Sequence, residues 1–326
     1  MQPFSYMRAG TVDDALAALS QDARILAGGT TLYDLMKLGV EAPQRVVDIA
    51  RLPLRDIRLE DNVLVLGAGV RMSAAAEHPD VGSSAPALSE ALWRAASQQL
   101  RNMAALGGNL LQRTRCSYFR HGAPYACNKR EPGSGCAAQD GLSRHHALLG
   151  GSEHCIAAYP GDFAVALAAF DAEVEITGPS GARLMPLVDL HREPGSEPQR
   201  DTNLRPTELI TAIRVPLVRA ARASTYHKIR DRESYAFALV SAAVGLEVEG
   251  SIVVDARVAL GGVATRPWRS REAEQVLIGR SFSEGRAREA GIAAFSSARP
   301  TGHNAFKIEL GARAVTDALM IASTRS

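Results

Sequence analysis

The chain has 326 residues, of which 46% are hydrophobic, 22% charged and 5% aromatic, proportions typical of a globular protein with two or three domains. Its 37 basic and 35 acidic residues give a net charge of +2, so nothing global favours binding to nucleic acid or to a membrane surface. No apolar run approaches the roughly 18 residues that span a bilayer, and the N-terminal stretch lacks a secretory pattern. By its own sequence we expect a cytoplasmic chain with no membrane insertion and no nucleic-acid partner.

The first 58 residues predict a small α/β unit. Hydrophobic periodicity indicates a helix over residues 12–21, a buried strand over 23–29, a second helix over 32–39 and a second strand over 45–50. A polar turn with two glycines separates the first strand from the second helix.

Residues 59–217 alternate between strand and helix patterns. Strands are predicted over residues 62–70, 172–178 and 208–216, and helices over 89–106 and 161–172. A segment rich in Gly, Pro, Arg and His interrupts them without a sustained period, which is uncommon in a compact domain unless the segment has a function or is disordered.

The remainder of the chain predicts a second domain. From about residue 223, the stretch 234–264 predicts a helix followed by a strand hairpin with its turn at 249–251, and two further helices are expected over 270–279 and 309–323. Before it, residues 191–203 form a long polar loop, either a surface excursion or a lid.

Two glycine turns are candidates for binding an anionic ligand. Gly28-Gly29-Thr30-Thr31 follows a strand and precedes a helix, where glycine permits close approach to the backbone and free N–H groups attract phosphate. Gly107-Gly108-Asn109 follows a predicted helix, so a plain C-cap is the alternative there. Neither turn matches a Rossmann or P-loop pattern. Together they suit a ligand with two phosphates.

All four cysteines fall within one interval of 40 residues, at Cys116, Cys127, Cys136 and Cys155. No close C-x2-C pair occurs, so zinc is possible but not indicated, whereas an irregular loop with wide intervals can supply four thiolates to an iron–sulfur cluster. Six basic and three acidic residues between Arg113 and Cys155 would offset the negative charge of such a cluster.

Three alternatives to a cluster remain open for the cysteines. The first is four unrelated thiols, and the second is a closed zinc site. The third is two disulfides, which would need an oxidising compartment for which the chain shows no signal. Neighbouring histidines keep the zinc alternative open, although we expect them to be loop residues or to support ligands: His121, His145, His146 and His154.

The order of motifs resembles the FAD-binding subunit of the molybdenum hydroxylases, the group of xanthine dehydrogenase, aldehyde oxidoreductase and carbon monoxide dehydrogenase. The resemblance runs over nearly the whole chain, from ILAGGTTLYDLMK through RNMAALGGNL, the P-x-D at Pro160 and Asp162, ELITAIRVP and Lys228 to ALGGVATRPWRSREAEQVLIG. Within that group, the cysteine insertion resembles the flavin subunits of bacterial periplasmic-type aldehyde oxidoreductases, where it holds a 4Fe–4S cluster.

The resemblance implies an α+β fold. A two-part FAD-binding domain of the PCMH type would occupy residues 1–217, with subdomains of about 1–58 and 59–217 and a 4Fe–4S insertion at 113–157. A CO dehydrogenase flavoprotein C-terminal-like α/β domain would follow at 223–326.

The resemblance also implies the cofactor sites. The FAD contacts would be Ile25, Leu26, Ala27, Gly28, Gly29, Thr30, Thr31, Leu32, Gly107, Gly108, Asn109, Thr114, Asp162, Ile210 and Lys228, and the cluster ligands would be the four cysteines. From the residues alone, Asp162 is better explained as a helix N-cap and Lys228 as a surface lysine. Tyr159 departs from the family, which places His or Ser before Pro160.

The implied function is electron transfer in an oxidoreductase complex without catalytic residues in this chain. A large molybdenum-pterin subunit would oxidise an aldehyde, a small 2Fe–2S subunit would carry the electrons, and the FAD of this chain would pass them to an external acceptor. Export with a signal-bearing partner would place the heterotrimer in the periplasm. The alternatives are a stand-alone FAD oxidase of the vanillyl-alcohol type and a zinc-stabilised scaffold.

Overall fold

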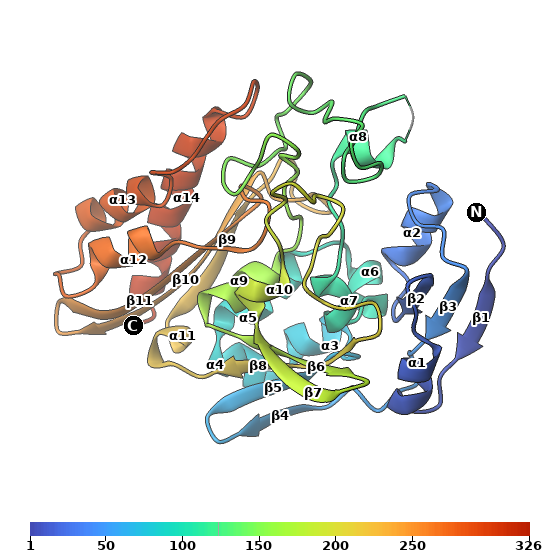
Figure 1. Cartoon of the computed structure of the whole chain (residues 1–326). Coiled ribbons are helices and arrows are strands. Elements are labelled where there is room, and N and C mark those ends of the chain that lie inside the picture. The colour runs from blue at the N-terminus through green and yellow to red at the C-terminus, as the bar shows by residue number, and fades with distance from the viewer. Residues whose placement is uncertain (123) are drawn as a thin grey trace.

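The N-terminal part of the chain forms a three-stranded parallel sheet (Figure 1). The structure is a computed structural model that describes residues 1–122 and 124–326. Strands β1 (Ser5–Arg8), β3 (Arg45–Asp48) and β2 (Ala23–Leu26) pair in that order, connected by α1 (Val12–Ala18) and α2 (Leu32–Lys37). The two helices and two strands predicted for this unit are confirmed, and β1 is an additional strand.

A five-stranded antiparallel sheet follows. Its strands lie in the order β4 (Ile57–Glu60), β5 (Val63–Gly67), β8 (Leu209–Pro216), β6 (Glu173–Gly178) and β7 (Gly181–Pro186). Helices pack against it, and α9 is apolar on all sides because each of its residues is buried. These helices are α3 (Met72–Glu77), α4 (Pro79–Ser84), α5 (Pro86–Arg94), α9 (Phe163–Ala169) and α10 (Leu187–Leu190).

The single helix predicted over residues 89–106 is wrong. The chain instead forms α5, α6 (Gln98–Met103) and α7 (Leu106–Leu110). Ala96 has φ +49°, which breaks the helix, and the Ser97 hydroxyl accepts a hydrogen bond from the N–H of Leu100 to begin the next one. The apolar positions continue across the break because α5 and α7 face the same core, whereas α6 contributes no residue to it and buries only Arg101.

The C-terminal part is a four-stranded antiparallel sheet covered by helices. The strand order is β12 (Trp268–Arg269), β11 (Ile252–Gly261), β10 (Val240–Glu249) and β9 (Ser224–Ile229), with α11 (Arg219–Arg222) before β9. After the sheet come α12 (Arg271–Leu277), α13 (Glu284–Ala293) and α14 (Phe306–Ser323). In Figure 1 these three helices lie together at one side of the molecule.

The helix predicted before the hairpin of this domain is wrong. Residues 231–239 contain no helix, and the apolar run belongs to β10, whose first seven residues are all buried. Because β10 packs between α14 on one face and α9 on the other, it shows no alternation of apolar and polar residues. The hairpin with its turn at 249–251 is confirmed.

The cysteine segment, residues 113–157, runs between the N-terminal unit and the C-terminal helices (Figure 1). Among its described residues, regular structure is limited to α8 (Ser117–Arg120) and isolated bridges such as Cys127 with Cys136. One side packs on the N-terminal unit through Leu35 and Phe119. Among the described residues, no helix is both long and apolar enough to cross a bilayer.

Candidate functional site

The first glycine turn connects β2 with α2, as predicted. Gly29 has φ +74°, a conformation that favours glycine, and a Cβ on Gly28 would lie 2.1 Å from the carbonyl oxygen of Met103. Within the described residues, the N–H groups of residues 28–32 donate to no protein acceptor, and Thr31 makes no cap hydrogen bond. The turn therefore presents a row of free donors, and its glycines are required by geometry.

The second glycine turn lies inside helix α7, so its interpretation as the C-cap of a preceding helix is wrong. The N–H groups of Leu106 and Gly107 donate to the carbonyl oxygens of Val70 and Ala68, each at 2.9 Å. A Cβ on Gly107 would lie 2.9 Å from the Ala68 Cβ, whereas a Cβ on Gly108 would find no atom closer than 4.0 Å. Gly107 therefore permits a close backbone approach, and Gly108 faces open space.

Both turns line one cleft of about 690 Å³. This volume lies within the range of sites for cofactor-sized ligands. A third wall is formed by the loop at residues 199–206. Oδ1 of Asn109 and Oε1 of Gln199 have no hydrogen-bond partner among the described residues, but both atoms are buried and expose almost no surface to the cleft.

Most of the predicted FAD contacts lie on this cleft. Those lining it are Ile25, Ala27, Gly28, Gly29, Thr30, Thr31, Leu32, Gly107, Gly108, Asn109 and Ile210. Leu26, Thr114, Asp162 and Lys228 do not line it. The loop at 199–206 carries residues that sequence analysis did not assign to the site, although the polar run at 191–203 was the signal for a lid.

Charged side chains form a connected row along the cleft. Glu41 accepts from Arg24 at 3.0 Å and from Arg113 at 2.6 Å, and Arg113 also donates to Asp201 at 2.7 Å. Burial raises the pKa of Asp201, but the charges of Lys129 and Arg113 outweigh it and hold that pKa below its ordinary value. Asp201 is therefore ionised and bonded to two cations.

Asp162 and Lys228 form a buried ion pair behind the cleft. Lys228 Nζ lies 2.8 Å from one carboxylate oxygen of Asp162, and the Tyr226 hydroxyl donates to the other at 2.5 Å. Burial, followed by the charge of Asp162, raises the pKa of Tyr226, which keeps its proton on the hydroxyl. Asp162 occupies the N-cap position of α9, as its sequence context predicts, but its side chain makes no cap hydrogen bond. Lys228 is buried, so its interpretation as a surface lysine is wrong.

The four cysteines line one small pocket. Cys127 and Cys155 are buried, Cys116 and Cys136 are partly exposed, and all four are free thiols. Tyr118, Phe119, Asn128 and His154 complete much of the pocket wall. The structure thus joins residues that are separated by up to 39 positions in sequence.

The geometry of this pocket does not favour a single metal ion. Among the described residues, no group of three or more His, Cys, Asp or Glu side chains converges closely enough to bind one. A cubane cluster separates its four cysteine ligands more widely than a single zinc ion does. Burial raises the pKa of Cys116 to about 12 and also raises that of Cys155, so without a metal these two thiols keep their protons.

His146 supports the pocket from the outside. Its Nε2 lies 3.2 Å from the Cys116 sulfur, and burial lowers its pKa to about 4, which leaves the ring neutral. Its carbonyl oxygen accepts from Lys307 Nζ at 3.0 Å and lies within reach of the Asn304 amide. Lys307 and Asn304 of the C-terminal domain therefore hold His146 in place beside Cys116.

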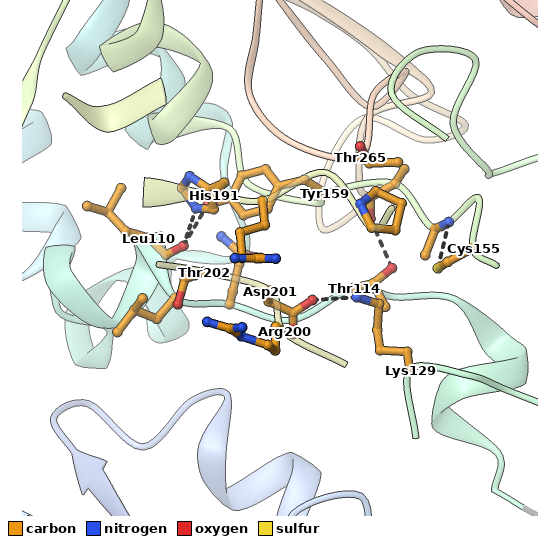
Figure 2. A pocket seen from close by; sticks show the side chains of 16 residues that line it. Leu110, Thr114, Lys129, Cys155, Tyr159, His191, Arg200, Asp201, Thr202 and Thr265 are labelled. Atoms are coloured by element: carbon orange, nitrogen blue, oxygen red, sulfur yellow. Dashed lines mark hydrogen bonds and ion pairs between the residues drawn. The ribbon is translucent and has the colours of Figure 1, made fainter. Parts of the chain in front are cut away.

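A third cavity, much smaller than the cleft, shares lining residues with both the cleft and the cysteine pocket. Figure 2 shows the residues that line it. It shares Arg200, Asp201 and Thr202 with the cleft, and Lys129 and Cys155 with the cysteine pocket. Its volume of about 30 Å³ has room for water but not for a cofactor.

Two of the residues singled out in the sequence belong to this third cavity. The Thr114 hydroxyl donates to the carbonyl oxygen of Ala158 at 2.9 Å, and the Tyr159 hydroxyl donates to that of Leu110 at 3.0 Å. Tyr159 thereby forms a specific contact in place of the family's smaller residue.

Comparison with known proteins identifies the family. The chain matches the FAD binding domain in molybdopterin dehydrogenase over residues 2–218 and the CO dehydrogenase flavoprotein C-terminal domain over residues 224–322. The aldehyde oxidoreductase FAD-binding subunit PaoB of Escherichia coli strain K12 is 46% identical over 325 residues, 98% of each chain. The carbon monoxide dehydrogenase medium chain of Afipia carboxidovorans is 28% identical over 86% of this chain and 82% of its own.

Solved structures give the same result. The reconstituted CO dehydrogenase from Oligotropha carboxidovorans superposes with a TM-score of 0.79 and 25% identity, over 100% of this chain and 99% of that one. The carbon monoxide dehydrogenase from Hydrogenophaga pseudoflava that lacks the Mo-pyranopterin moiety gives 0.77 and 26%, over 99% and 98%.

Fold and site together define an FAD-binding domain of the molybdopterin dehydrogenase type followed by a CO dehydrogenase flavoprotein C-terminal domain. The chain belongs to the molybdenum hydroxylase family as its FAD-binding medium subunit, and it is therefore an oxidoreductase subunit. The predicted α+β fold and family are confirmed.

Proposed function

We propose that the cleft binds FAD with its pyrophosphate between the two glycine turns. The observation that carries this proposal is the set of unpartnered N–H groups at residues 28–32, which face the same cleft as Gly108. Backbone donors at a strand-to-helix turn suit phosphate oxygens.

The remaining predicted contacts have different support. Ile25, Ala27, Leu32 and Ile210 supply apolar walls. Leu26 ends strand β2 and does not line the cleft, so its contact with FAD stays a prediction. That Thr114, Asp162 and Lys228 also contact FAD stays a prediction, because their side chains bond within the protein outside the cleft.

We further propose that the chain serves a complex that oxidises an aldehyde. The support is its 46% identity over 98% of each chain to a subunit named for aldehyde oxidoreductase. In this complex a large molybdenum-pterin subunit oxidises the substrate and a small 2Fe–2S subunit delivers the electrons. FAD supplies the chemistry that accepts an electron pair and releases it to an external acceptor, while this chain binds the cofactor and shields it.

The four cysteines are proposed to hold a 4Fe–4S cluster. They line a single pocket, and among the described residues none of them forms a disulfide. The net positive charge of the segment offsets the negative charge of four thiolates.

Anaerobic purification followed by visible spectroscopy and metal analysis tests these proposals. We expect flavin absorption with one FAD and about four irons per chain, the content of one cluster. We also expect no aldehyde turnover until the molybdenum subunit is added. Metal-replete protein with FAD but without iron or labile sulfide would refute the cluster, and aldehyde oxidation by the isolated chain would refute the subunit role.

A further inference from the structure

The loop at residues 199–206 forms a wall of the FAD cleft but has little regular structure of its own. Its backbone is bonded to residues 190–192: His191 and Thr202 form an isolated bridge, the Arg192 N–H donates to the Asp201 carbonyl oxygen at 3.0 Å, and the Asn203 N–H donates to that of Leu190 at 2.9 Å. None of these contacts comes from the cysteine segment. The position of this wall relative to the cysteine segment therefore depends on the side chains that connect the two.

Asp201 connects the loop to the cysteine segment through its side chain. Its two carboxylate oxygens accept from Lys129 Nζ at 2.5 Å and from Arg113 Nε at 2.7 Å. Lys129 Nζ donates in addition to the carbonyl oxygen of Pro198 at 2.5 Å, so one lysine fixes the loop at two points. Both bonds to Asp201 are charge-assisted, and such bonds are about twice as strong as neutral ones.

Lys129 and Arg113, which bond to Asp201, also contact or line the cysteine pocket. Lys129 lies two positions after Cys127, lines the cysteine pocket and has only 8% of its side chain exposed. The Arg113 guanidinium lies over the Phe119 ring, 4.7 Å from its centroid, and Phe119 lines the same pocket. Arg113 and Asp201 also line the FAD cleft.

A change in the cysteine segment therefore reaches the cleft through these ion pairs. If the segment loosens, Lys129 and Arg113 leave their positions and Asp201 is left as a half-buried carboxylate without its partners. Breaking one side of such a pair is strongly destabilising, so the loop would rearrange to rehydrate the charge. The cleft wall would move with it, because Asp201 belongs to that wall.

We propose that Asp201 is a positioning residue that couples FAD retention to the order of the cysteine segment, and hence to its loading with iron. The coupling to iron rests on the proposed cluster, whereas the tie between loop and segment does not. Figure 2 shows Asp201 between Thr114 and Arg200, with Lys129 below, in the small cavity that connects the two sites.

A double-mutant cycle tests the tie without reference to iron. The dissociation constant of FAD is measured by flavin fluorescence for the full chain as purified, in wild type, Asp201→Asn, Lys129→Met and the double variant. We expect each single variant to weaken FAD binding at least about fivefold, the low end of typical coupling between sites. The double variant should bind FAD no less tightly than the single variant with the lower affinity.

Glu197→Gln is the matched control. It removes the same charge two residues before the loop, but within the described residues the Glu197 side chain bonds only to Arg192 and Arg200, has no bond to the cysteine segment, and does not line the cleft. Wild-type FAD affinity is expected for it. Circular dichroism of each variant establishes folding, and Lys129→Met tests the tie from the other end if Asp201→Asn does not fold.

The effect of iron chelation on FAD affinity distinguishes coupling from a merely structural role of Asp201. In wild type, chelation should weaken FAD binding at least about fivefold, and in Asp201→Asn it should have no further effect. Equal weakening by chelation in both proteins, wild-type affinity of both single variants, or a double variant that shows the product of the single effects would overturn the proposal. If wild type never binds iron, the proposed cluster fails, and the cycle on iron-free protein still decides the tie.

Discussion

Gly28→Ala and Gly108→Ala should both weaken FAD binding, with opposite effects on the stability of the FAD-free protein. At Gly28 the new methyl would lie 2.1 Å from the Met103 carbonyl oxygen, so the chain must move by about 0.9 Å to reach the 3.0 Å below which real contacts essentially never occur. Overpacking of this kind costs about 1–3 kcal/mol. At Gly108 the nearest atom is 4.0 Å away, so the protein accommodates a methyl without movement.

The expected magnitudes follow from these two situations. Gly28→Ala displaces one glycine turn from the other, and if the 1–3 kcal/mol appears in the bound state, the FAD dissociation constant rises about 5- to 150-fold. Gly108→Ala replaces a glycine within helix α7, which favours the folded state by roughly 0.5–1 kcal/mol. Its methyl nevertheless occupies the space through which phosphate approaches the backbone, so FAD binding should fall at least about tenfold.

The assay combines FAD titration by fluorescence with thermal unfolding of the FAD-free variants. Gly39→Ala is a control for strain alone, since Gly39 has φ +71° but no atom within 4 Å of an added Cβ and does not line the cleft. It should lower the melting temperature and leave FAD affinity unchanged. Wild-type affinity in Gly108→Ala would refute the phosphate site, and an unchanged melting temperature in Gly28→Ala would refute the steric argument.

Three other predictions concern the cysteine pocket, the buried ion pair and acid stability. Cys136→Ser should lose iron measured by metal analysis while the protein stays folded; full iron content would show that Cys136 is no ligand. Lys228→Met should lower the free energy of unfolding in urea by about 3–5 kcal/mol because it leaves Asp162 charged and buried, and Asp162→Asn combined with it should recover part of that loss. Burial raises the pKa of Asp48, but hydrogen bonds from Tyr6, Ala50 and Arg8 outweigh burial and hold that pKa below its ordinary value of 3.8. Asp48→Asn should therefore reduce the free energy of unfolding at pH 7, and the difference from wild type should start to shrink near pH 4 and vanish as the pH falls through the folded pKa; a difference that does not shrink at all below pH 4 would contradict the assignment.

Local patterns in the sequence were sufficient to predict the first glycine turn, whereas its role in a cofactor site came from its pairing with the second turn and from the family resemblance. A buried strand, two glycines and an amphipathic helix specify their own geometry over about 15 residues, and β2, Gly29 and α2 adopt it. The second turn was predicted to follow a helix, but it lies inside helix α7. The apolar residues before Gly107 continue the helical period of α5, so the sequence did not show that a new helix begins there. The backbone contact of Gly107 with Ala68 shows this in the structure.

Properties that depend on distant contacts were not predictable from the residues alone. Asp162 precedes a helix, which favours an N-cap, but its carboxylate is taken by Tyr226 and Lys228 on β9, more than 60 positions away. The helix predicted before the β10 hairpin failed for a related reason. A strand that is covered on both faces has no alternating pattern by which to distinguish it from a buried helix.

Clustering of the cysteines in sequence correctly indicated a shared location, but not how that location relates to the flavin cleft. The link lies in Arg113 and Lys129, which the sequence offered only as part of a local positive charge. The structure shows each of them bonded to Asp201, a residue of a separate loop some 70 to 90 positions later. Because the same residues line both the cleft and its neighbouring cavities, substitutions in the cysteine segment should be judged by FAD affinity as well as by iron content.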